Sequence, residues 1–169
     1  MARLSLILGG ARSGKSARAL ALAEAPRVFI ATAEALDDEM AERIRRHHAE
    51  RGPDWGLAEA PLELAAAVRD HSGERVTLVV DCLTLWLSNL MHHGRDADAE
   101  IDALVLALAE APGRVVLVSN EVGLGLAPVN ALGRAFRDAQ GRLNQRIAGA
   151  ADHVEFVAAG LPLILKGAP

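Results

Sequence analysis

The chain has 169 residues and a formal net charge of −4, and 51% of its residues are hydrophobic, which suits one domain with a sizeable core. Aromatic residues make up only 3%, and tyrosine is absent, which disfavours proteins that stack single-stranded bases on aromatic rings. The acidic balance also disfavours a general nucleic-acid surface. We therefore expect a single domain over residues 1–169 with no nucleic-acid partner.

The chain has one cysteine, Cys82, which excludes an internal disulfide and a zinc site built from several thiolates. Near the amino terminus the run LSLIL, residues 4–8, is too short for a secretory signal. No apolar run approaches the ~20 residues that cross a membrane. These features predict a cytoplasmic protein without a membrane span.

Short apolar runs alternate along the chain with stretches that suit helices. In chain order we predict a strand at 4–8, a helix at 15–25, a strand at 28–31, helices at 37–51 and 61–70, a strand at 76–80, helices at 83–91 and 98–110, a strand at 115–118, a helix at 130–151, and one or two strands at 154–157 and 163–165. Apolar strands separated by helices indicate an α/β fold whose mostly parallel sheet is covered on both faces. In such sheets ligands bind at the carboxyl ends of the strands.

The segment GGARSGKS, residues 9–16, fits the phosphate-binding pattern G-x-x-x-x-G-K-[ST] between a predicted strand and a predicted helix. Its glycines let the backbone curl so that N–H groups point at phosphate oxygens. We expect Lys15 to reach the β- and γ-phosphates and the Ser16 hydroxyl to bind Mg²⁺. The predicted nucleotide contacts are Gly9, Gly10, Ala11, Arg12, Ser13, Gly14, Lys15 and Ser16.

Asp81 directly follows the apolar run Leu78-Val79-Val80. P-loop enzymes place an acid at the end of a neighbouring strand to organise Mg²⁺, so Asp81 is predicted to bind the nucleotide's metal together with Ser16. The alternative is that Asp81 caps the following helix. Asn120 and Glu121 end another strand and could meet either substrate. The guanine-reading motif N-K-x-D of switch proteins is absent there, since residues 119–122 read SNEV.

The segment RIRRHHAERG, residues 43–52, sets two adjacent histidines among four arginines. In a helix His47 shares a face with Arg51, whereas His48 points about 100° away. Neighbouring arginines disfavour the cationic imidazole, which leaves a neutral nitrogen able to attack phosphorus. A solvated basic helix end is the alternative, and a metal site is disfavoured because adjacent histidines point in different directions. The pair at 92–93 is expected in a surface turn.

Six stretches together carry a resemblance that the P-loop alone would not: GGARSGKS, IATAEALDDEM, RIRRHHAERGPDW, VVDCLTLWLSNL, VVLVSNEVGLGLAP and GRLNQRIAGAADHVEFVAAGLPLILKG. The chain resembles, nearly end to end, the bifunctional adenosylcobinamide kinase / adenosylcobinamide-phosphate guanylyltransferase family of cobalamin biosynthesis. The resemblance implies a P-loop NTPase fold, a RecA-like three-layer sandwich, assembled as a homotrimer.

That family phosphorylates adenosylcobinamide with ATP or GTP. It then transfers GMP from GTP through a histidine–GMP intermediate, giving adenosyl-GDP-cobinamide and pyrophosphate. The resemblance implies that His47 carries the GMP, with His48 as the remaining candidate, while the P-loop motif itself predicts Lys15 as a catalytic residue. The resemblance also implies nucleotide contacts at Ala33, Glu34, Ala35, Arg51 and Glu59. The P-loop alone would leave open a kinase of another small molecule or a RecA-type binding module.

Overall fold

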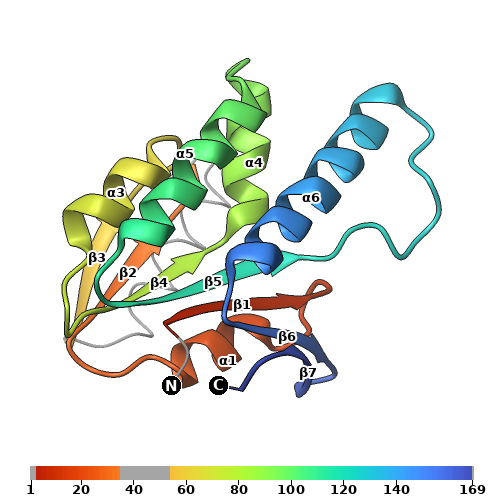
Figure 1. The fold of residues 1–169 in the computed structure, drawn as a ribbon. Coiled ribbons are helices and arrows are strands. Elements are labelled where there is room, and N and C mark those ends of the chain that lie inside the picture. Colours follow the sequence, from red (N-terminus) through yellow and green to blue (C-terminus); the bar gives the residue numbers. More distant parts are fainter. Residues whose placement is uncertain (1–2, 35–53, 169) are drawn as a thin grey trace.

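The computed structural model describes residues 3–34 and 54–168, which form a seven-stranded sheet in the order β3-β2-β4-β5-β1-β6-β7 (Figure 1). The strands are β1 (Leu4–Gly9), β2 (Arg27–Ala31), β3 (Trp55–Glu59), β4 (Thr77–Asp81), β5 (Arg114–Asn120), β6 (His153–Ala158) and β7 (Leu161–Lys166). The helices are α1 (Lys15–Ala21), α3 (Leu64–His71), α4 (Leu83–His92), α5 (Ala97–Glu110) and α6 (Ala131–Ala150). β7 runs antiparallel to β6, and the other described pairings are parallel.

Helices cover both faces of the sheet, with α3, α4, α5 and α6 on one side and α1 on the other (Figure 1). Leu6 and Leu78 belong to the core on the four-helix side, whereas their chain neighbours Ile7 and Val79 belong to the core beneath α1. Strands buried on both faces read as continuous apolar runs, which is why the central strands were recognisable in the sequence. The predicted α/β P-loop sandwich with a mostly parallel sheet is confirmed.

β3 is a strand that the sequence analysis did not predict. It lies at one edge of the sheet, beside β2, and three of its five residues are exposed. An edge strand of this kind carries no apolar run or clear alternation, because little of it faces a core.

Two predicted helix boundaries were wrong. The helix expected from Pro61 begins at Leu64, because the carbonyls of Pro61 and Leu62 accept hydrogen bonds from Asn89 Nδ2 (3.0 Å) and Trp86 Nε1 (2.8 Å). The carbonyl of Leu62 also accepts the N–H of Leu64, only two residues along the chain (2.9 Å), which is not a helical pairing.

The first helix, expected to reach residue 25, ends at Ala21. There the N–H of Leu22 also bonds the carbonyl of Ala19, three residues back (3.2 Å), which tightens the last turn.

The carboxyl-terminal region forms two strands, joined by a turn in which Ala159 and Gly160 have positive φ (52° and 79°). All six residues of β7 are exposed. The helix predicted at 37–51 lies outside the described residues. Among the helices of residues 3–34 and 54–168, none combines the length and apolarity needed to cross a bilayer.

Candidate active site

The carboxyl ends of the parallel strands meet at one edge of the sheet. Gly9, where β1 enters the P-loop, pairs with Asn120 at the end of β5. Ala31, at the end of β2, pairs with both Glu59 and Asp81 at the ends of β3 and β4. This shared register brings the predicted P-loop, Asp81 and Glu59 to the same edge, where parallel sheets bind ligands.

The P-loop is closed on itself and tied to the β6–β7 turn. Lys15 is buried (9% exposed), and its Nζ donates to Gly10 O at 3.0 Å. The N–H of Ser13 also donates to Gly10 O (3.3 Å), and the N–H of Gly160 donates to Ser13 O (2.8 Å). The lysine is therefore folded back over its own loop.

Two loop glycines are required by their surroundings. Gly14 has φ of 96°, and a Cβ there would lie 3.2 Å from Gly160 Cα. A Cβ on Gly9 would lie 2.5 Å from Ser13 Oγ and 2.6 Å from Val157 O. The sequence motif thus coincides with real steric needs, as a phosphate cradle demands.

The helix that follows the P-loop is anchored by a charged cluster that the sequence analysis missed. Arg18 on α1 binds Glu155 on β6 through two hydrogen bonds, Nε–Oε2 at 2.7 Å and Nη2–Oε1 at 2.6 Å. Glu155 is fully buried, and His153 Nε2 contacts its Oε1 at 2.9 Å. The Arg18 hydrogen bonds hold the pKa of Glu155 below its ordinary value, against the opposing effect of burial. In the sequence, the cluster could have been noticed from His153 and Glu155, two polar residues that alternate with apolar ones within a strand.

Ser16 and Asp81 offer the oxygen donors predicted for Mg²⁺. Ser16 lies in the first turn of α1 and Asp81 at the end of β4, and both are half-buried. Burial raises the pKa of the Cys82 thiol most, and the charge of the neighbouring Asp81 raises it further, whereas Lys15 lowers it. A hydroxyl and a carboxylate are hard ligands that suit Mg²⁺, which keeps waters and substrate phosphates as its other ligands. The two residues therefore fit the ion.

The alternative role of Asp81, as the cap of α4, stays a prediction. The residue at the N-cap position of α4 is Cys82, one residue beyond Asp81.

The loop after β2 is fixed to this edge by Thr32. Its hydroxyl donates to Cys82 O (2.7 Å) and accepts from Cys82 N (2.8 Å), and its carbonyl accepts from Asn89 Nδ2 (2.8 Å). Ala33 and Glu34, which follow, are half-buried. Both Glu34 oxygens lie near His93 Nε2, at 3.0 and 3.1 Å.

The two histidines at 92 and 93 lie in different elements, one in a helix and one in a turn. His92 is the last residue of α4, so the predicted surface turn holds only for His93, which follows the helix.

The remaining predicted contacts are only partly described. Glu59 is exposed and lines a pocket of about 470 Å³ that continues along α3. Ala35, His47, His48 and Arg51 lie outside the described residues.

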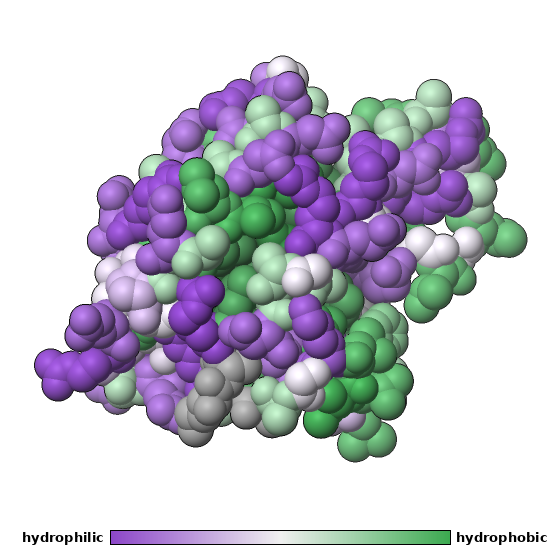
Figure 2. Space-filling model, viewed as in Figure 1, coloured by the Kyte–Doolittle hydropathy of each residue, from purple (hydrophilic) through white to green (hydrophobic). Residues whose placement is uncertain are grey.

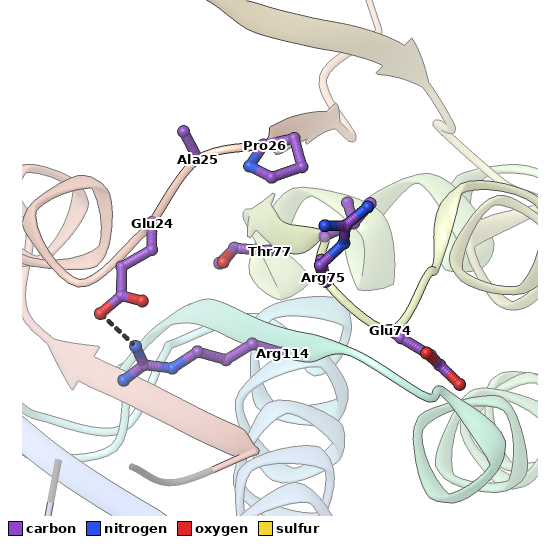
Figure 3. Close-up of a pocket in the computed structure, with 8 residues that line it drawn as sticks. Glu24, Ala25, Pro26, Glu74, Arg75, Thr77 and Arg114 are labelled. Carbon is purple, nitrogen blue, oxygen red and sulfur yellow. Dashed lines mark ion pairs between the residues drawn. The ribbon is translucent and has the colours of Figure 1, made fainter.

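Another hollow, of about 610 Å³, opens at the opposite edge of the sheet (Figure 3). It is lined by Pro26, just before β2, by Thr77 at the start of β4 and by Arg114 at the start of β5. Arg114 makes an ion pair with Glu24 across it at 3.7 Å. Because these are the amino ends of the strands, this hollow is separate from the P-loop edge.

Comparisons with known proteins agree with the resemblance found in the sequence. The family described as cobinamide kinase / cobinamide phosphate guanyltransferase matches residues 5–165. The "Bifunctional adenosylcobalamin biosynthesis protein CobP" of Pseudomonas aeruginosa is 48% identical, over 97% of this chain and 98% of that protein. The "Bifunctional adenosylcobalamin biosynthesis protein CobU" of Salmonella typhimurium is 40% identical, over 95% and 98%.

A solved structure from Pyrococcus horikoshii, from the study titled PH0250, shares the fold with a TM-score of 0.53. It is 10% identical, and the match covers 99% of this chain and 87% of that one. The family match and the relatives rest on sequence and cover almost the whole chain. The chain therefore belongs to the cobinamide kinase / cobinamide phosphate guanyltransferase family, the bifunctional kinase and guanylyltransferase of adenosylcobalamin biosynthesis.

Proposed function

We propose that the P-loop edge of the sheet carries both reactions. The chain phosphorylates the hydroxyl of adenosylcobinamide with ATP or GTP, and then transfers GMP from GTP to that phosphate. The single observation that carries this location is the closed loop at residues 9–16, with the buried Lys15 amine at its centre and Asp81 on the same edge.

In the kinase step the backbone N–H groups of residues 9–16 bind the nucleotide's phosphates. Lys15 exchanges Gly10 O for oxygens of the β- and γ-phosphates, and its charge offsets the charge of the phosphoryl group in transfer. Ser16 and Asp81 would hold Mg²⁺, which supplies further charge neutralisation when bound. The cobinamide hydroxyl oxygen forms a bond to the γ-phosphorus as the bond from that phosphorus to the nucleoside diphosphate breaks.

In the guanylyl step a neutral nitrogen of His47 attacks the α-phosphorus of GTP. A P–N bond forms, the bond to the β-phosphate oxygen breaks, and pyrophosphate leaves. The phosphate of adenosylcobinamide phosphate then attacks the same phosphorus, which releases His47 and forms adenosyl-GDP-cobinamide. The assignment rests on the family pattern around RIRRHH, with His48 as the competing residue.

The guanine nucleotide is held by Ala33, Glu34, Ala35, Arg51 and Glu59. Glu34 already contacts His93, whereas Glu59 is exposed at the end of β3 and makes no hydrogen bond to the described residues. We therefore assign to Glu59 the N1–H and N2–H₂ donors of the guanine base, which a carboxylate accepts well.

The active assembly is a homotrimer in the cytoplasm. Exposed apolar side chains gather in two places, seen in Figure 2 over the segment that joins β5 to α6 and over β7. The loop patch comprises Leu124, Leu126, Val129 and, in the first turn of α6, Leu132, and the strand patch comprises Leu161, Leu163, Ile164 and Leu165. Patches of this kind mark protein interfaces, and two different patches suit the head-to-tail contacts of a closed ring. The free, buried Cys82 suits a reducing compartment.

The test of the guanylyl step is covalent labelling. The protein is incubated with α-³²P-GTP and Mg²⁺ and then denatured, and the retained label is examined for acid-labile, alkali-stable phosphoramidate chemistry. We expect label in the wild type and in His48→Ala, and none in His47→Ala. Label retained in His47→Ala but lost in His48→Ala would move the role to His48. Transfer of ³²P from γ-labelled nucleotide to cobinamide tests the kinase step, and its absence would contradict the proposal.

A further inference from the structure

β5 lies between β4 and β1, the two strands whose carboxyl ends lead to the residues proposed to bind the nucleotide. On one side β4 ends in Asp81, and on the other β1 leads into the P-loop. Asn120, the last residue of β5, pairs with Gly9, and the N–H of Glu121 donates to Gly9 O at 3.1 Å. Asn120 therefore stands beside the point where the phosphate loop begins.

The backbone of Asn120 is held on both sides by buried side chains. Its N–H donates to Thr84 Oγ1 on α4 (2.8 Å), and its carbonyl accepts from Asn144 Nδ2 on α6 (3.0 Å). Asn144 is itself fixed, because its Oδ1 accepts from Ser119 Oγ (2.7 Å) and Gln140 Nε2 (3.0 Å). This buried network of hydrogen bonds holds the backbone of Asn120 at the ligand edge of the sheet.

The side chain of Asn120 is used differently from those of the other asparagines. The chain has four asparagines, and the carboxamides of the other three make hydrogen bonds within the fold. Asn89 Nδ2 binds two carbonyls, Asn130 Oδ1 caps α6, and Asn144 binds through both ends. Neither end of the Asn120 carboxamide bonds a described residue, and its Oδ1 is shielded from solvent without a partner. Such an acceptor in a native structure calls for an explanation, and ligand binding is one.

Glu121, the neighbouring polar residue, differs from Asn120 because one of its carboxylate oxygens bonds within its own loop. Its Oε1 accepts the N–H of Gly123 at 2.5 Å, within the loop that leaves the sheet. The structure thus separates the two polar residues at the end of β5.

We propose that Asn120 is a catalytic residue of the kinase step, whose carboxamide orients the attacking hydroxyl of cobinamide against the γ-phosphoryl group. This rests on the proposed function of the P-loop edge. A carboxamide offers an acceptor, Oδ1, for the hydroxyl proton and a donor, Nδ2, for an oxygen of the transferred phosphoryl group. Because no described side chain fixes the amide's orientation, the ligands set it.

The transfer itself balances without a strong base. The hydroxyl oxygen bonds to the γ-phosphorus, the bond from that phosphorus to the β–γ bridging oxygen breaks, and the nucleoside diphosphate leaves with that electron pair. The hydroxyl proton passes to the solvent through an oxygen of the new phosphate. Phosphoryl transfer through a loose transition state depends mainly on such positioning and on charge stabilisation.

The test compares Asn120→Ala and Asn120→Asp with the wild type in the two half-reactions. We expect the kinase kcat to fall roughly 30- to 300-fold, as when a positioned hydrogen-bond group is removed. Covalent labelling by α-³²P-GTP should stay within about threefold, because guanylyl transfer to the protein requires neither the cobinamide hydroxyl nor transfer of the γ-phosphoryl group. The Tm of Asn120→Ala should equal or exceed that of the wild type, since the substitution removes an unsatisfied buried acceptor. A fold role would lower it, as expected for Asn144→Ala.

Lys15→Ala separates this inference from the function on which it rests. It should lose both half-reactions, and retention of both would contradict the proposed site. If Lys15→Ala loses both while Asn120→Ala keeps its kinase kcat within about threefold, only the assignment of Asn120 is overturned. An equal loss of kinase activity and labelling in Asn120→Ala also overturns it, because the residue would then serve nucleotide binding in general.

Discussion

Arg18 and Glu155 form a two-point ion pair, at 2.7 and 2.6 Å, that ties the helix after the P-loop to β6. Glu155 is fully buried, and Arg18 keeps 31% of its side chain exposed. Because Arg18 lies one turn beyond Lys15, the pair fixes the helix that carries the lysine proposed to bind phosphate. The same carboxylate meets His153, so that one buried charge organises both β6 and α1.

Replacing Glu155 by glutamine should destabilise the fold at neutral pH. The substitution removes the charge that Arg18 binds and leaves a guanidinium that water only partly reaches. We expect a loss of about 2 kcal/mol, at the low end for a buried pair because Arg18 is partly exposed. This corresponds to a fall in Tm of roughly 4 to 8 °C for a chain of this size, measured by calorimetry at pH 7.

The loss of stability in Glu155→Gln should depend on pH, and its sign follows from the pKa of Glu155. The Arg18 hydrogen bonds depress the pKa of Glu155 in the folded state below its ordinary value of 4.5. The resulting stabilisation is complete above that value and is lost as the pH falls through the lower, folded-state pKa. The Tm difference between wild type and Glu155→Gln should therefore shrink on acidification below the ordinary carboxyl range. Glu110→Gln, in an exposed pair with Arg69, is the matched control and should change Tm little at any pH.

Alanine at Gly14 should damage the fold of the P-loop, whereas alanine at Gly10 should not. Gly14 has φ of 96° and its added Cβ would meet Gly160 Cα at 3.2 Å, but a Cβ on Gly10 meets nothing within 4 Å. We expect Gly14→Ala to lose about 1 to 3 kcal/mol in urea unfolding and to bind nucleotide poorly. Gly10→Ala should unfold at the wild-type urea concentration. Equal unfolding midpoints for the two variants would contradict the strained conformation at Gly14.

How much of the fold could be predicted from the sequence depends on the burial of each element. Central strands such as Leu78-Val79-Val80 are apolar on both faces, so that residue types alone revealed them. The P-loop could be predicted because its glycines are required by the backbone geometry of the loop itself. β3 was missed because it lies at an edge, and the helix start at Leu64 was missed because the preceding carbonyls bind α4. Contacts between residues distant in the chain leave no local pattern.

The same distinction between local patterns and long-range contacts decides which residues of the proposed active site could be predicted from the sequence. Lys15, Ser16 and Asp81 were predicted from spacing along the chain, and the register of the strands brings their elements to one edge. Arg18 and Glu155 are 137 residues apart, and no motif joins them. For Asn120, the sequence showed a polar residue at a strand end, but only the hydrogen bonds of its neighbours distinguish it from Glu121.

The oligomeric state should depend on the loop patch. Leu126 and Val129 are 99% and 96% exposed, so that aspartate at both positions removes apolar surface without disturbing the core. We expect light scattering to give three times 17.8 kDa for the wild type and 17.8 kDa for the double variant. Leu106→Asp, at an exposed position on α5 outside both patches, should keep the wild-type mass. A wild-type mass of one chain would contradict the trimer.

Thr32 should be essential to the geometry of the edge on which Asp81 sits. Its hydroxyl is fully buried and serves Cys82 twice, donating to the carbonyl at 2.7 Å and accepting from the N–H at 2.8 Å. Valine has the same shape but leaves both backbone groups of Cys82, the residue after Asp81, without these partners. The expected loss is about 2 to 4 kcal/mol, because each buried polar group left unpaired costs roughly 1 to 3 kcal/mol. Thr77→Val is the control, since Thr77 is a buried residue whose hydroxyl makes no described hydrogen bond, and it should cost much less in the same urea titration. Equal losses in the two variants would show that the Thr32 hydroxyl contributes only its shape. A selective loss in Thr32→Val, with a raised KM for nucleotide in the folded fraction, would show that the link from β2 to Cys82 holds Asp81 in place for the nucleotide.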